Sequence, residues 1–104
     1  MSNHDWQQEV AAVMKRHDLC HDPTAHVLDL VSEIGEFAKV LLVSTDYGRK
    51  PWTPVRGLED EFGDVLYSLL ATAEVCGLDP DRALRRALDK YEGRLARRGQ
   101  AGSR

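Results

Sequence analysis

The sequence lacks the features of a membrane protein, a disulfide-stabilised protein and a nucleic-acid-binding protein. No apolar run approaches the roughly 18–20 residues of a membrane-spanning helix, and the segment Met1–Trp6 is too polar for a secretory signal. The two cysteines, Cys20 and Cys76, form no CxxC pair, which favours a reduced, cytoplasmic protein. Because 14 Lys and Arg stand against 17 Asp and Glu, the net charge is −3, and no nucleic-acid partner is expected.

Nothing in the sequence reads as a β-strand, so an all-α protein is expected. Three prolines mark helix starts, because Asp22, Thr53 and Asp79 each directly precede a proline and can cap a first turn. Gly77 can end the third helix in a left-handed conformation. Together these signals predict four helices, over residues 4–18, 23–46, 55–76 and 80–97.

The length of 104 residues, with 42% apolar and 30% charged residues, fits one domain over residues 1–104 with a flexible tail from about residue 98. The main apolar stripe of the second helix comprises Val27, Leu30, Val31, Ile34, Ala38 and Leu41. Leu28, Leu42 and Val43 lie outside this stripe, and so much apolar surface has to be covered from several directions. The sequence therefore predicts a four-helix bundle that is completed by dimerisation.

Two pairs of carboxylates stand out in the second and third helices. Glu33 and Glu36 are three residues apart, and so are Glu61 and Asp64, so each pair lies on one helix flank, about 60° apart around the axis. If the two helices pack antiparallel, four negative groups meet across one groove and need a counter-charge. Hard oxygen ligands with spare coordination positions suit Mg²⁺, with Mn²⁺ as a substitute.

Basic and aromatic residues near the ends of the chain are candidates for substrate contacts. Lys90 and Arg94 share one face of the fourth helix, where they form either a phosphate clamp or a solvated basic helix end. An aromatic ring can stack on a nucleobase, so Trp6 and His21 are candidates to hold a base. Trp6 also precedes the apolar Val10, so packing in a core or an interface is the alternative for its ring.

The carboxylate motif resembles that of the MazG-type nucleotide pyrophosphohydrolases, which belong to the all-alpha NTP pyrophosphatase superfamily. An ExxE pair at Glu33–Glu36 is followed by an ExxD pair at Glu61–Asp64, and then by the Lys90–Arg94 stretch. The resemblance covers about residues 22–97. It implies an all-helical fold and interlocked homodimers, or homotetramers made from two of them.

The resemblance also implies an activity and roles for individual residues. Members of the family use Mg²⁺ to hydrolyse nucleoside or deoxynucleoside triphosphates to monophosphate and pyrophosphate, as in the cleaning of the nucleotide pool. By the same resemblance, the metal ligands and catalytic groups would be Glu33, Glu36, Glu61 and Asp64, with Glu33 or Glu36 taking a proton from the attacking water. Lys90 and Arg94 would reach the phosphates, and His21 would lie beside the nucleotide.

Two departures from the family pattern keep alternatives open. Tyr91 and Glu74 occupy positions where many relatives have Asn, which favours a helical nucleotide- or metal-binding module without efficient turnover. Within the superfamily, a dUTPase-like enzyme and a phosphoribosyl-ATP pyrophosphatase are further alternatives. Release of pyrophosphate from a panel of triphosphates would separate an enzyme from a binding module.

Overall fold

The computed structural model describes residues 3–98, which form four α-helices and, over that range, no β-strand. The helices are α1 (Asn3–Arg16), α2 (Pro23–Ser44), α3 (Leu58–Cys76) and α4 (Pro80–Arg98). The all-α prediction is thus confirmed. Of the tail predicted from about residue 98, Arg98 is the last residue of α4, and residues 99–104 lie outside the described part of the chain. None of the four helices is long and apolar enough to cross a membrane.

Two of the three predicted helix starts are confirmed by capping hydrogen bonds. The backbone N–H of Thr24 donates to the Asp22 carboxylate over 2.9 Å at the start of α2. The Asp79 carboxylate accepts from the backbone N–H groups of Asp81 and Arg82, over 3.1 and 3.2 Å, at the start of α4. Each bond satisfies an N–H group that has no partner within the helix, so both helices begin where the sequence predicts.

The helices on either side of the α2–α3 connection are shorter than the predicted ranges 23–46 and 55–76. α2 ends at Ser44 instead of residue 46, because Asp46 and Tyr47 adopt positive φ angles of 49° and 57°. α3 begins at Leu58 instead of residue 55, because Gly57 has a φ of 89°, which cannot be part of a right-handed helix. The proline after Thr53 therefore does not start this helix.

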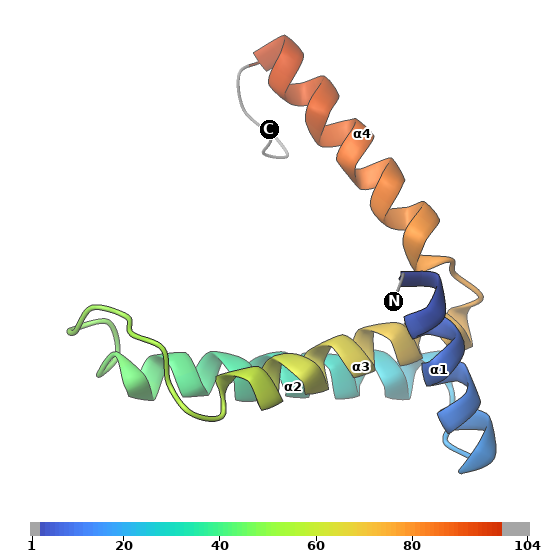
Figure 1. Ribbon diagram of the computed structural model, residues 1–104, viewed down its shortest axis with the longest axis horizontal. Helices are drawn as coiled ribbons and strands as arrows, with labels where there is room; N and C mark the ends of the chain where they lie inside the picture. The colour runs from blue at the N-terminus through green and yellow to red at the C-terminus, as the bar shows by residue number, and fades with distance from the viewer. Residues whose placement is uncertain (1–2, 99–104) are drawn as a thin grey trace.

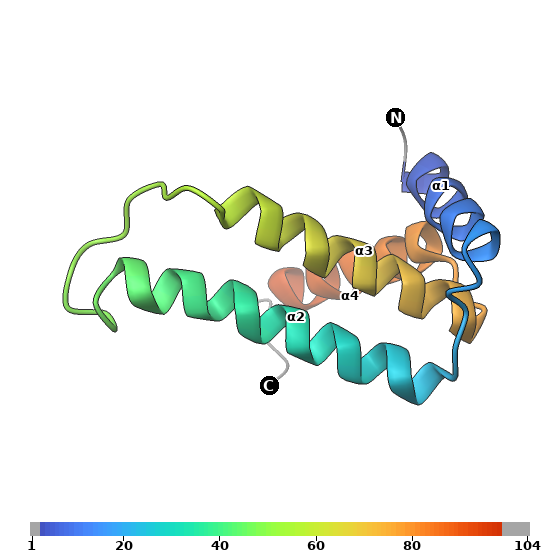
Figure 2. The ribbon, with the colours of Figure 1, turned by 90° about the horizontal axis from the view of Figure 1, so that it is seen from below.

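α2 and α3 lie side by side and run antiparallel (Figures 1 and 2). The side chains of α2 that are partly shielded along this contact recur every three or four residues: Leu30, Glu33, Phe37, Val40 and Ser44. The rings of Phe37 and Phe62 meet across the contact, 6.1 Å apart. Toward its other end, the Thr72 hydroxyl lies 3.4 Å from the backbone carbonyl of His26. We call this contact the α2–α3 seam, and it includes a carboxylate, that of Glu33.

α1 packs on α3 and on the beginning of α4. The Gln7 side-chain amide donates to Glu74 Oε1 over 2.8 Å, and the Met14 side chain is fully buried. Figure 1 shows that α4 leaves the end of α3 at a wide angle and runs away from α2 and α3. Glu74, one of the two departures from the family pattern, thus accepts a hydrogen bond that links α1 to α3.

Little of the apolar surface is buried within one chain. Over the described residues, the buried apolar side chains are Met14, Leu70, Ala71 and Ala73. Val31 and Ile34 of the predicted α2 stripe face away from α3, and Val31 is 60% exposed. Within one chain, then, the helices leave the bundle open, and Val31 and Ile34 are free to contact another molecule.

Candidate functional site

Three carboxylates converge at the α2–α3 seam. Glu33 comes from α2, and Glu61 and Asp64 come from the first two turns of α3. One oxygen of each of these groups lies within 4.8 Å of an oxygen of the other two. Glu33 and Glu61 are partly buried, whereas Asp64 is exposed to solvent. The antiparallel packing thus brings Glu33 of the first predicted pair to both members of the second pair, whereas Glu36 is not one of the three converging carboxylates.

Glu36 lies beside this three-carboxylate cluster and contributes to its negative potential. The pKa of Glu61 is raised above its usual value of 4.5, first by burial and then by the negative charges of Asp64, Glu36 and Glu33. Among residues 3–98, none of these four groups forms an ion pair with a lysine or arginine. The cluster therefore combines proximity of like charges with the lack of a protein counter-charge.

This donor set fits a divalent cation that prefers oxygen. Glu33, Glu61 and Asp64 offer hard, negatively charged ligands from two rigid helices, and the exposure of Asp64 leaves room for water and substrate oxygens. A bound cation would also offset the repulsion that raises the pKa of Glu61. The residues present thus match the chemistry of a Mg²⁺ or Mn²⁺ site.

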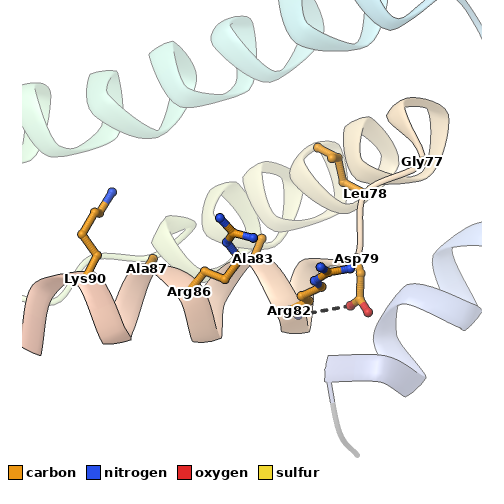
Figure 3. Close-up of a pocket in the computed structure, with 8 residues that line it drawn as sticks. All are labelled: Gly77, Leu78, Asp79, Arg82, Ala83, Arg86, Ala87 and Lys90. Atoms are coloured by element: carbon orange, nitrogen blue, oxygen red, sulfur yellow. Dashed lines mark hydrogen bonds between the residues drawn. The ribbon is translucent and has the colours of Figure 1, made fainter.

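Within one chain, Lys90 and Arg94 lie apart from the carboxylates, because α4 diverges from the α2–α3 pair (Figure 1). Lys90 lines a cavity of about 640 Å³ between the end of α3 and α4. Figure 3 shows that Arg86 and Lys90 extend from one side of α4 into this space. The Lys90 ammonium and the Arg94 guanidinium lie 5.2 and 5.9 Å from the centre of the Tyr91 ring. The Tyr91 ring is therefore within cation–π distance of both predicted phosphate contacts.

Trp6 is also separated from the carboxylates of its own chain. It lines a cavity of about 340 Å³ between α1 and α3, together with Gly63 and Tyr67. Gly63 points about 200° away from Glu61 around the axis of α3, since successive residues are 100° apart. Trp6 thus lies at the contact of α1 with α3, whereas the cluster lies at the contact of α2 with α3.

His21 lies in the connection between α1 and α2, at one end of the seam. Its backbone N–H donates to Nε2 of His26 over 3.0 Å, and the two rings stack with centres 5.7 Å apart. His26 is buried in the first turn of α2, two turns before Glu33. Of the predicted substrate contacts, His21 is therefore the one that its own chain holds at an end of the seam.

Arg56 is a residue near the cluster that the sequence analysis missed. It lines a cavity of about 410 Å³ that also contains Glu36 and Lys39. The predicted helix over 55–76 places Arg56 inside a helix, whereas the structure places it just before Gly57, which has a positive φ angle. Recognising Gly57 as the residue that precedes the helix would have identified Arg56 as part of the loop.

Comparison with known proteins settles the family. The sequence model of the MazG nucleotide pyrophosphohydrolase domain matches residues 7–98. The chain belongs to this family. The resemblance drawn from the carboxylate motif is thereby confirmed, and the match extends to α1, which the motif did not cover.

Two curated relatives of this MazG-family chain are both named dCTP pyrophosphatase 1. The Homo sapiens protein is 35% identical over 85 residues, which cover 74% of this chain and 50% of the relative. The Rattus norvegicus protein is 36% identical over 73 residues, which cover 66% of this chain and 43% of the relative. The chain thus spans about half the length of these relatives. No solved structure matches it significantly.

Proposed function

We propose that this chain is a Mg²⁺-dependent nucleotide pyrophosphohydrolase, which converts a nucleoside or deoxynucleoside triphosphate to monophosphate and pyrophosphate. The observation that carries the proposal is the convergence of Glu33, Glu61 and Asp64 in a chain that matches the MazG domain. Because both curated relatives are named for dCTP, this deoxynucleotide is the first substrate to test. Removal of unwanted nucleotides from the pool is the corresponding cellular role.

In this proposal, Glu33, Glu61 and Asp64 hold the cation, Mg²⁺ or its substitute Mn²⁺. When bound, the cation polarises phosphoryl oxygens and lowers the pKa of a water molecule. Glu36 stands outside the three-carboxylate cluster but near enough to raise the pKa of Glu61. Glu33 or Glu36 is proposed to accept a proton from the water that attacks the α-phosphorus, on the side opposite the leaving pyrophosphate.

The active assembly is proposed to be a homodimer, or a homotetramer built from two dimers. One chain exposes 7960 Å², about 2,000 Å² more than the roughly 5,900 Å² expected for a compact monomer of 11.7 kDa. Burying this excess on each of two chains gives about 4,000 Å², which is in the range of obligate dimers. The exposed apolar stripe of α4, with Leu84 and Leu88, is available for such an interface.

A second copy would also account for the separated substrate contacts. Lys90 and Arg94 lie on α4, which diverges from α2 and α3, and Trp6 lines a cavity between α1 and α3 instead of the α2–α3 seam. We propose that these residues contact a nucleotide that is bound mainly by another copy. In this arrangement the Lys90 ammonium and the Arg94 guanidinium contact its phosphates. His21 is proposed to lie beside the nucleotide held by its own chain.

The test is a panel of ribo- and deoxynucleoside triphosphates, incubated with the purified chain and Mg²⁺, with every product identified. We expect equal amounts of monophosphate and pyrophosphate. Release of orthophosphate would contradict the proposed position of attack. Binding without turnover would instead favour the module without efficient catalysis, for which Tyr91 and Glu74 provide the argument from sequence.

A further inference from the structure

A second group of charges lies directly beside Glu36. The cavity of about 410 Å³ lies between the last turns of α2 and the chain just before α3. It is lined by Glu36, Lys39, Val40, Val43, Ser44, Val55 and Arg56. Glu36 belongs to both regions, because it lines this cavity and its charge also acts on Glu61. Glu36 thus links the acidic cluster to this cavity, which we call the Lys39–Arg56 cavity.

The charges follow one order along both helices. On α2, Glu33, Glu36 and Lys39 follow one another at intervals of three residues, about 4.5 Å along the helix axis. α3 runs in the opposite direction to α2. From Asp64 toward the start of α3 come Glu61 and then, in the loop before the helix, Arg56. Both elements therefore lead from carboxylates to a cation in the same direction, toward the end of the pair that carries the α2–α3 loop.

Among residues 3–98, the charges of Lys39 and Arg56 are not neutralised by an ion pair. By contrast, Arg49, in the same loop as Arg56, pairs with Asp46 at 3.6 Å. The side chains of Lys39 and Arg56 are both exposed to solvent and line the same cavity, so an anion can reach them together. Within residues 3–98, Lys39 and Arg56 thus lack the ion pair that Arg49 forms.

We propose that Lys39 and Arg56 bind the terminal phosphates of the triphosphate, which leave together as pyrophosphate. The proposal rests on the proposed function, because it places the α-phosphate at the carboxylates of the same chain. The two terminal phosphates then extend toward Lys39 and Arg56 in the Lys39–Arg56 cavity, where an ammonium and a guanidinium offset their charge. This subsite selects triphosphates over monophosphates. It belongs to the same chain as the metal-binding carboxylates, whereas the proposed contacts from α4 come from another copy.

The test compares Lys39→Gln/Arg56→Gln with the matched control Arg49→Gln/Lys50→Gln. Both double variants lose two positive charges at the same end of the molecule, but Arg49 and Lys50 do not line the cavity. The probes are pyrophosphate, a non-hydrolysable triphosphate analogue and the corresponding monophosphate, each titrated by calorimetry in Mg²⁺. Thermal unfolding checks that both variants fold. Lys39→Arg, which keeps the charge, should retain most of the affinity.

We expect the first variant to bind pyrophosphate and the analogue at least 10-fold more weakly than the wild type, with monophosphate affinity unchanged. The control should lose less than threefold. Equal losses in both variants would show general attraction instead of a subsite and would overturn the proposal, as would no loss in either. Whatever the variants show, the proposed function stands as long as the wild type hydrolyses triphosphates. A wild type that neither binds nor hydrolyses any triphosphate overturns both proposals.

Discussion

Glu33 and Glu61 approach each other across the α2–α3 seam, with carboxylate oxygens within 4.8 Å and both side chains partly buried. Burial and repulsion both disfavour two ionised carboxylates at this distance. Apolar residues such as Phe37 and Val40 occupy the neighbouring positions of the same seam. The packing of α2 on α3 thus holds these carboxylates close together. The free-energy cost of their mutual repulsion and partial burial would be offset by a bound metal ion.

The raised pKa of Glu61 predicts a pH dependence of stability in the absence of metal. The folded state binds the Glu61 proton more tightly than the unfolded state, whose carboxyl titrates near 4.5. Ionised Glu61 therefore destabilises the fold above its folded-state pKa, and this loss disappears as the pH falls through that value toward 4.5. In urea unfolding with chelator, Glu61→Gln should exceed the wild type in stability at pH 7, with the gap closing toward pH 4.5. A gap that widens at lower pH would contradict this account.

The predicted dimer can be tested at Val31, which is 60% exposed in one chain. In a monomer, Val31→Asp would change stability by less than about 0.5 kcal/mol, because it alters a solvated position. In the proposed dimer it buries a charge, so the mass found by light scattering should fall and unfolding should become easier. Wild type should give at least twice 11.7 kDa, and the neighbouring Ser32→Asp serves as the control. A wild-type mass of one chain would refute the dimer.

Arg94→Lys tests the phosphate clamp, because lysine keeps the charge but loses the planar guanidinium. A clamp that acts on the leaving pyrophosphate predicts a fall in kcat as well as a rise in KM, whereas a rise in KM alone indicates uniform binding. A solvated helix end predicts that Arg94→Lys and Lys90→Arg both change activity and stability by less than about 0.5 kcal/mol. We expect the clamp, and silent substitutions at both positions would exclude it.

Shared sites between two copies predict complementation. If Arg94 acts on a nucleotide held by the other chain, co-expression of Glu61→Gln with Arg94→Ala produces mixed dimers with one intact site. Turnover by the purified mixed dimers should then exceed that of either variant alone by at least 10-fold. Activity no higher than that of the separate variants would place Arg94 in the site of its own chain.

Sequence reasoning was most successful where a local rule determines the structure. The caps at Asp22 and Asp79 set the starts of α2 and α4, because a side-chain oxygen before a proline satisfies a free N–H group of the first turn. The three-residue spacing of the carboxylates likewise placed Glu61 and Asp64 on one flank of α3. Neither inference needed information about distant parts of the chain.

Sequence reasoning failed where several local signals compete or where another molecule matters. Thr53-Pro54 is an adequate helix start, but the positive φ of Gly57 delays α3 and leaves Arg56 in the loop. Hydrophobic periodicity identified the stripe with Ile34, but it does not say whether a stripe meets its own chain or another one. In the structure Val27, Val31 and Ile34 of that stripe are exposed, whereas Leu30 of the stripe lies with Glu33 on the flank that meets α3.

The most direct test of the proposed function is pyrophosphate release from dCTP and the other triphosphates by the wild type, Glu61→Gln and Glu59→Gln in Mg²⁺. Glu61→Gln removes a charge with almost no change in volume, so the fold should persist, with equal or greater thermal stability without metal. Turnover should fall by about 100-fold or more, as expected for a lost metal ligand. Glu59→Gln, an exposed neighbour outside the cluster, should stay near the wild-type rate. Equal activity of Glu61→Gln and the wild type would contradict the assignment of the carboxylate cluster as the metal-binding catalytic site.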